Sequence, residues 1–208
     1  MLRTEALTQE SKELFPLLFH FRESFYLAGG TALALQIAHR ISVDFDLFSK
    51  DPIKKTLLEK FETIYAPRPV EILVNNSREL TVLVAGVKHT FLHYPFPLVL
   101  PFERNEVIDI LSSKEILATK AYTIGRRGSF KDYVDLYTGL REGISTLQEV
   151  INLSSMKYKE AFSDRLFLEQ LLYLDDVVED TVIMLHRENL TKQLITDFFS
   201  EKIAELHL

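Results

Sequence analysis

Apolar residues in the first part of the chain follow helical and strand-like spacing in turn. Leucine and phenylalanine recur at helical spacing over residues 8–21, and residues 25–28 form a short apolar run that is typical of a buried strand. Good helix formers fill residues 32–40, and we expect Thr31 to cap that helix. Residues 42–48 alternate strictly between apolar and polar side chains, which predicts another strand.

The pattern then predicts a helix at residues 54–65 and two antiparallel hairpins that extend the sheet. The turn residues Asn75, Asn76, Ser77, Ala85 and Gly86 separate the strand-like runs. These three runs lie at residues 70–74, 80–85 and 88–94.

From about residue 108 onward the spacing is helical. Residues 112–115 have the composition of a capped helix start, and long amphipathic stretches cover residues 166–185 and 190–206. The sequence pattern therefore predicts an α+β fold, with a mixed sheet in residues 1–107 and a helical region in residues 108–208 that packs on the sheet.

Composition narrows the class of protein. The 208 residues are 47% hydrophobic and include no cysteine. There is no secretion signal pattern and no apolar run of about 18 residues, so we expect a cytoplasmic protein without a membrane span. The formal charge of -6 argues against a broad electrostatic grip on nucleic acid, although it leaves a local basic patch open.

Two acidic residues share one face of the strand at residues 42–48. Asp44 and Asp46 are two positions apart, so their Cα atoms lie roughly 6.5 to 7 Å apart and both carboxylates can converge on a divalent cation. The alternative is that they are the solvated face of a half-exposed strand. His39 and Arg40 precede them and could orient Asp44, contact phosphate, or only neutralise a helix C-terminus.

A glycine pair at the preceding strand-to-helix junction favours cation binding by the two aspartates over the solvated-face interpretation. Gly29 and Gly30 let backbone amides approach a phosphate closely, and the helix that follows adds a favourable dipole. Alone, the pair indicates only a tight turn. Followed by Asp44 and Asp46, it indicates a phosphoryl- or nucleotidyl-transfer site.

These segments resemble the AbiEii/AbiGii nucleotidyltransferase toxin family of the polymerase-beta-like nucleotidyltransferase superfamily. The resemblance is carried by LAGGTALALQIAHRISVDFDLF at residues 27–48 and by KAYTIGRRGSFKDYVDLY at residues 120–137. Weaker similarity follows at LLYLDD, residues 171–176, and at residues 184–185. It spans nearly the whole chain, and its first block is the most specific.

The resemblance implies a polymerase-beta-like sheet whose active site is completed by the helical region. It implies that Asp44 and Asp46 bind Mg²⁺, or Mn²⁺, and that Lys120 and Asp132 are catalytic. The residues implied to bind the nucleotide are Gly29, Gly30, Thr31 and Arg127.

The second block also has a plainer interpretation. Lys120, Arg127 and Lys131 could form a solvated basic helix face. With the resemblance, we expect Asp135 to brace Arg127. A basic strip of Arg126, Arg127 and Lys131 beside the site would favour an RNA acceptor.

The third metal carboxylate that polymerase-beta-like enzymes commonly place on a neighbouring strand is not evident. The interior of residues 80–94 offers no acid, which leaves Glu71, Glu79 or Asp132 as candidates.

The resemblance implies transfer of a nucleoside monophosphate from an NTP to tRNA, another RNA or a protein. It further implies a toxin of a toxin–antitoxin or phage-defence system, restrained by a cognate antitoxin. The alternatives are a metal-dependent phosphoesterase and a catalytically reduced protein that binds a nucleotide or a partner.

Overall fold

The computed structural model describes residues 2–178, 181–186 and 190–206, and at Arg127 it describes the backbone alone. The chain divides into two compact units. The first comprises Met1–Pro97 and Pro101–Ser112, and the second comprises Leu98–Leu100 and Ser113–Leu208. The sequence pattern predicts the division after residue 107. The packing of the helical region on the sheet remains a prediction.

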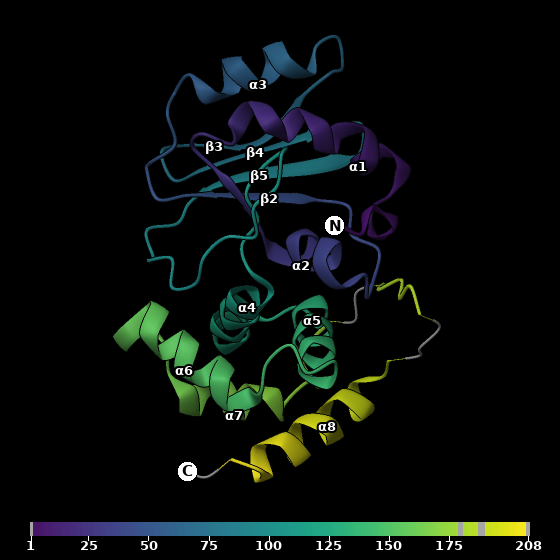
Figure 1. Cartoon of the computed structure of the whole chain (residues 1–208), viewed down its shortest axis with the longest axis vertical. Coiled ribbons are helices and arrows are strands. Elements are labelled where there is room, and N and C mark those ends of the chain that lie inside the picture. The colour runs from purple at the N-terminus through teal and green to yellow at the C-terminus, as the bar shows by residue number, and fades with distance from the viewer. Residues whose placement is uncertain (1, 179–180, 187–189, 207–208) are drawn as a thin grey trace. The chain divides into compact units, whose positions relative to one another are not determined.

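A mixed five-stranded sheet forms the centre of the first unit (Figure 1). The strand order is β1-β2-β5-β4-β3, in which β2 and β5 are parallel and the other neighbours are antiparallel. The strands are β1 (Tyr26–Ala28), β2 (Phe45–Ser49), β3 (Glu71–Asn75), β4 (Glu79–Val84) and β5 (Val87–His93). The expected α+β class and the two expected hairpins are confirmed.

The turn between β4 and β5 shows why that hairpin was recognisable. Ala85 and Gly86 have φ angles of 49° and 76°, which are the positive values that a tight two-residue hairpin turn requires. The register continues from Val84 opposite Val87 to Glu79 opposite Leu92 without a shift.

Helices α1 (Gln9–Leu14) and α3 (Leu57–Tyr65) lie on the same side of the sheet (Figure 1). The helix expected at residues 8–21 is in fact divided, because Pro16 stands at the start of a 3-10 helix, η2 (Phe15–Phe21), that continues α1. Ring contacts close the core on this side, with the Phe91 centroid 4.9 Å from that of Phe21 and 5.9 Å from that of Phe61.

Helix α2 (Gly29–Ile37) begins and ends earlier than expected. Its N-cap is Ala28, which makes no side-chain cap hydrogen bond, so the expected cap at Thr31 is wrong. The helix ends because Ala38 adopts a left-handed conformation with φ 51°, which leaves His39 and Arg40 beyond it.

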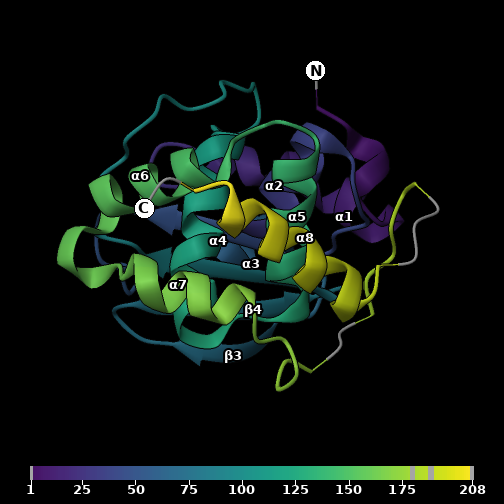
Figure 2. The same ribbon diagram turned by 90° about the horizontal axis from the view of Figure 1, so that it is seen from below.

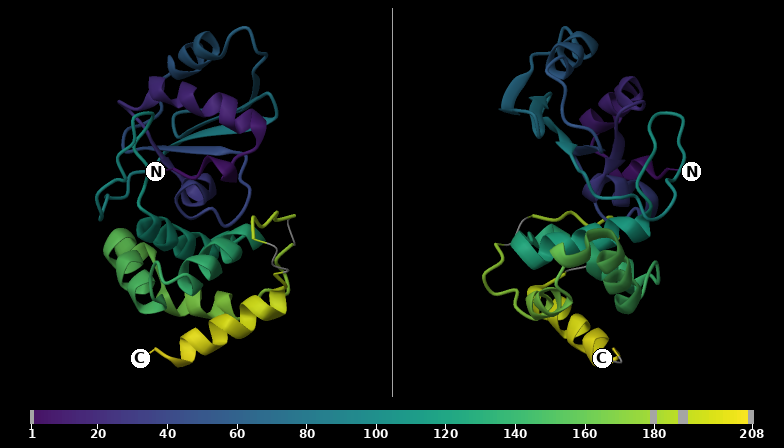
Figure 3. Two further views of the ribbon diagram at one scale, coloured as in Figure 1. Left: turned by 45° about the vertical axis from the view of Figure 1, so that its right-hand side comes forward. Right: turned by 90° about the vertical axis from the view of Figure 1, so that its left-hand side faces the viewer.

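The second unit is helical, as the sequence predicted. Helix α4 is contacted by α5, α6 and α7, and α8 packs on α5 and α7 (Figure 2). Figure 3 shows α8, in yellow, against the helices coloured green. The elements are α4 (Ser113–Arg127), α5 (Phe130–Arg141), α6 (Leu147–Tyr158), the 3-10 helix η3 (Lys159–Ala161), α7 (Asp164–Leu171) and α8 (Lys192–Ala204).

A fully buried ion pair connects α4 and α6. Lys157 Nζ lies 2.6 Å from Glu115 Oε1, and both side chains are 0% exposed. The same carboxylate accepts hydrogen bonds from the backbone N–H groups of Val99 and Leu100. Glu115, expected only as part of a helix cap, therefore also ties residues 98–100 to the helices.

The helix expected over residues 166–185 is wrong beyond Leu171. Helix α7 ends there, and the described residues 172–178 form turns and irregular chain. Leu172, Tyr173 and Val178 are 45%, 52% and 81% exposed, so their apolar spacing marks no buried helix face. Residues 179–180 lie outside the described chain. No helix in the described ranges has the length and apolar character needed to cross a membrane.

Candidate functional site

The two aspartates lie at the start of β2. Asp44 directly precedes the strand and Asp46 is its second residue. Phe45 and Leu47 are fully buried, whereas both aspartates are only partly buried, as the alternation of the sequence predicts. Buried and partly buried side chains therefore alternate from Asp44 to Leu47.

The glycine turn lies directly against the second of these carboxylates. Ala28 is the Cα partner of Asp46 between β1 and β2, so the next residue, Gly29, starts α2 beside it. A Cβ atom on Gly29 would lie 2.1 Å from Asp46 Oδ2, and Gly29 also has a positive φ of 69°. Glycine is needed here both for its backbone conformation and for the space it leaves.

Thr31 has a different use from the one expected. Its side chain is buried, its hydroxyl donates to the backbone carbonyl of Asp44, and its Oγ1 lies 2.7 Å from Ser42 Oγ. Arg40 Nη1 in turn donates to Ser42 Oγ at 3.3 Å. This chain of hydrogen bonds fixes Asp44 to the first turn of α2, which supports the orienting role considered for Arg40.

Lys88 is a site residue that the sequence analysis missed. Its backbone N–H donates to Asp44 Oδ1 at 3.2 Å, and its Nζ lies 3.4 Å from Asp44 Oδ2. Both side chains are nearly half exposed, at 43% and 45%. The parallel pairing of β2 with β5 creates this contact, and no local pattern in the sequence indicates that pairing.

The structure does not bring Glu71 or Glu79 to the aspartate pair. They lie on β3 and β4, and β5 separates both strands from β2. Glu79 Oε1 instead accepts a hydrogen bond from Thr81 at 2.6 Å. Within the described ranges, no three His, Cys, Asp or Glu side chains gather as a metal site. Two carboxylates still suit Mg²⁺, which commonly takes one or two carboxylates plus substrate phosphates and water.

A second constellation lies within the helical unit. Lys120 Nζ, from α4, lies 2.7 Å from Asp132 Oδ1 and 2.8 Å from Asp135 Oδ2, both on α5. Asp135 is 0% exposed, and Lys120 and Asp132 are 10% and 13% exposed. Asp135 therefore pairs with Lys120. The expectation that Asp135 braces Arg127 stays a prediction, because the Arg127 side chain lies outside the described structure.

Asp132 is held as a carboxylate at the first turn of α5. Its Oδ2 accepts hydrogen bonds from the backbone N–H and the hydroxyl of Ser129, each at 3.0 Å. Burial alone would raise the pKa of Asp132, but the Lys120 ammonium and these hydrogen bonds hold that pKa below its usual value. Burial and the nearby Asp132 charge raise the pKa of Tyr133 to about 12, so its phenol stays neutral.

The structure describes the side chains of two of the three basic residues that would favour an RNA acceptor, Arg126 and Lys131. Arg126 lies with its guanidinium 4.0 Å from the centroid of the Tyr122 ring, and it donates to the backbone carbonyl of Ala161 at 2.9 Å. Lys131 is exposed. Asp44 and Asp46 belong to the first unit and Lys120 and Asp132 to the second, and their action on one substrate remains a prediction.

The strand order and the acidic pair behind a glycine turn define the class as a nucleotidyltransferase fold. The family model described as "Nucleotidyl transferase AbiEii toxin, Type IV TA system" matches residues 16–96. The chain is also 32% identical over 193 residues to protein aq_aa25 of Aquifex aeolicus, with 87% of each chain covered. The chain belongs to the AbiEii nucleotidyltransferase toxin family, which confirms the resemblance found in its sequence.

Solved structures share the fold at low sequence identity. MenT4, a nucleotidyltransferase toxin of Mycobacterium tuberculosis, is 18% identical with a TM-score of 0.62, covering 94% of this chain and 83% of its own. JHP933 of Helicobacter pylori is 16% identical with a TM-score of 0.59, covering 99% and 94%. Both comparisons support the α+β fold of this chain.

Proposed function

We propose that this protein transfers a nucleoside monophosphate from an NTP to an acceptor, as the toxin of a toxin–antitoxin pair. One observation carries the proposal: Gly29, at the start of α2, lies against the carboxylate of Asp46. This contact supports a single site in which the helix start would bind phosphate and the carboxylate pair would bind metal.

Asp44 and Asp46 would hold Mg²⁺, and Mn²⁺ suits the same oxygen ligands. The bound ion would stabilise negative charge on the phosphate oxygens during transfer. Lys88 lies 3.4 Å from Asp44 and offsets the charge of the carboxylate pair before substrate binds. The Thr31 hydroxyl keeps Asp44 in register with α2 through its backbone carbonyl.

The first turn of α2 would bind the triphosphate. The N–H groups of the first helical residues, Gly29, Gly30 and Thr31, have no partner within the helix, and the helix dipole favours an anion there. Thr31 contributes in this proposal through its backbone, because its hydroxyl is already bonded to Asp44.

The helical unit would supply charge to the same substrate. Lys120 would offset negative charge that develops on the transferred phosphate, and Asp132, kept anionic, would accept a proton or bind metal as the third carboxylate. Because Asp135 also holds Lys120, the ammonium stays in place when Asp132 engages the substrate. Arg127 is proposed to contact the nucleotide from the end of α4.

The acceptor in this proposal is an RNA, with tRNA the first to test, or a protein side chain. The toxin role follows from the family, and it implies a cognate antitoxin and a part in phage defence.

The test is incubation with each α-labelled NTP, Mg²⁺ and either total tRNA or cell extract. An Asp44→Asn, Asp46→Asn double variant removes the metal ligands, and Asp51→Asn is the control at an exposed aspartate nearby in the chain. Label on RNA or protein with the wild type and control, but not with the double variant, supports transfer. Release of free labelled NMP alone would support a phosphoesterase, and Mg²⁺-dependent NTP binding without any turnover would support a binding protein.

A further inference from the structure

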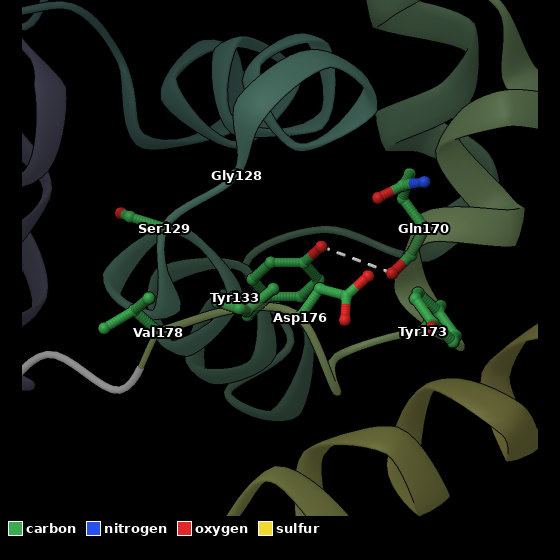
Figure 4. A pocket seen from close by; sticks show the side chains of 8 residues that line it. Gly128, Ser129, Tyr133, Gln170, Tyr173, Asp176 and Val178 are labelled. Atoms are coloured by element: carbon green, nitrogen blue, oxygen red, sulfur yellow. Dashed lines mark hydrogen bonds between the residues drawn. The ribbon is translucent and has the colours of Figure 1, made fainter.

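The helical unit contains a pocket that the proposed reaction has not yet used. Its volume is about 460 Å³, within the range of about 300 to 1,000 Å³ that is usual for small-molecule sites. Figure 4 shows the Tyr133 ring at its centre, with Ser129 and Val178 on one side and Gln170 and Tyr173 on the other. Gly128, Asp176 and Val177 complete the lining.

Two aromatic rings, one buried and one exposed, contribute apolar surface to the pocket. Tyr133 is only 1% exposed, and its hydroxyl donates to the Gln170 backbone carbonyl at 3.3 Å, which holds its ring in place. Tyr173 is 52% exposed, so its ring is open to a ligand that stacks on it. A flat aromatic ligand can stack on the exposed Tyr173 ring, which favours it over an aliphatic ligand.

Two polar side chains beside these rings offer hydrogen bonds of different kinds. Within the described part of the chain, no hydrogen bond engages the Gln170 side-chain amide or the Asp176 carboxylate. The amide can both donate and accept, whereas the carboxylate only accepts. A ligand that presents an amino group to Asp176 would therefore be preferred over one that presents a carbonyl.

The pocket also adjoins the Lys120–Asp132 pair. Ser129 lines the pocket, and the same residue donates two hydrogen bonds to Asp132 Oδ2, while Asp132 Oδ1 pairs with Lys120. A ligand in the pocket would therefore lie next to Ser129, which is hydrogen-bonded to the Lys120–Asp132 pair proposed to act on phosphate.

We infer that this pocket binds a nucleobase that carries an exocyclic amino group: adenine, cytosine or guanine. The base stacks on Tyr173, its amino group donates to Asp176, and Gln170 bonds a second position on the base edge. The inference rests on the proposed function for its substrate class. The base belongs either to the donor NTP or to the acceptor nucleotide, because both present the same chemistry.

A binding experiment tests the pocket without requiring catalysis. The ring resonances of the tyrosines are followed by NMR during titration with AMP, CMP, GMP and UMP, and Tyr173 is assigned from its loss in Tyr173→Phe. We expect the three amino-bearing nucleotides to shift the Tyr173 resonance, and UMP to shift it much less. Asp176→Asn should narrow the difference, since an asparagine amide can donate to the uracil carbonyl.

Steady-state transfer kinetics then identify the source of the base. Tyr173→Ala should raise one KM about tenfold, while Tyr173→Phe retains the stacking ring. Leu172→Ala is the matched control, because Leu172 is 45% exposed in the same turn but does not line the pocket. A raised KM for the NTP assigns the donor base, and a raised KM for the acceptor assigns the acceptor base.

The outcomes separate this inference from the proposed function. If the wild type transfers label but no nucleotide shifts the Tyr173 resonance, and Tyr173→Ala changes neither KM, the pocket inference is overturned while the transferase proposal stands. If nucleotides shift the resonance but no label is ever transferred, the base pocket stands and the transferase proposal fails. Equal shifts with UMP would overturn the assignment of the amino group.

Discussion

Replacing Gly29 with alanine tests whether the glycine turn and the acid pair work as one site. The added Cβ would lie 2.1 Å from Asp46 Oδ2. Ordinary contacts of this kind need about 3.5 Å, so the carboxylate or the helix start must move by more than about 1 Å. The same change also places a side chain at a φ of 69°.

These two effects have different magnitudes and different readouts. A displacement of about 1 Å at a reacting centre costs on the order of 100-fold in rate. A side chain in the left-handed region costs about 1 to 2 kcal/mol of stability. Gly86→Ala separates them, because Gly86 has a φ of 76° and nothing within 4 Å of its would-be Cβ.

Both variants are assayed for the initial rate of label transfer and for the free energy of unfolding in urea. We expect both to lose about 1 to 2 kcal/mol of stability, and only Gly29→Ala to lose about 100-fold in rate. Equal losses of rate in the two variants would attribute the effect to backbone strain. Full activity in Gly29→Ala would refute the close coupling of this turn to Asp46.

Two further predictions concern buried charge. Lys157→Met removes the buried cation that pairs with the Glu115 carboxylate and should cost about 3 to 5 kcal/mol in urea unfolding. Lys114→Met, which breaks an exposed pair with a 3.4 Å separation, should cost under about 1 kcal/mol, and similar losses in the two variants would contradict this account. Burial lowers the pKa of His89 to about 4, so the stability it contributes is present above about pH 6.5 and is lost as the pH falls towards 4, by ~3 kcal/mol. Between pH 7 and 4.5, the free energy of unfolding of the His89→Gln variant should fall less than that of the wild type. An equal fall in both proteins would contradict the inference that His89 is buried and neutral.

The sequence was informative where local chemistry and burial agree. Strict alternation around Asp44 and Asp46 predicted the buried and partly buried positions correctly, because Phe45 and Leu47 are in the core while both aspartates are only partly buried. The turn before β5 was equally clear, since Gly86 tolerates the positive φ that the hairpin requires.

The sequence was uninformative where tertiary contacts decide. Threonine is a residue type that often caps a helix, yet the Thr31 hydroxyl donates to the Asp44 carbonyl from inside the helix. Lys88 joins the site only because β5 lies parallel to β2, a pairing with no local signal. The apolar residues after Leu171 have helical spacing, although Tyr173 is half exposed and lies outside the helix.

The most direct test of the central claim compares α-labelled with γ-labelled NTP in one reaction with Mg²⁺ and the acceptor that the transfer assay identifies. Nucleotidyl transfer breaks the bond between the α- and β-phosphates, so the α label should enter the acceptor while an equal amount of γ label appears in pyrophosphate. Appearance of the γ label in the acceptor, or of labelled inorganic phosphate without any labelled acceptor, would contradict nucleotidyl transfer at the site built from Gly29, Asp44 and Asp46.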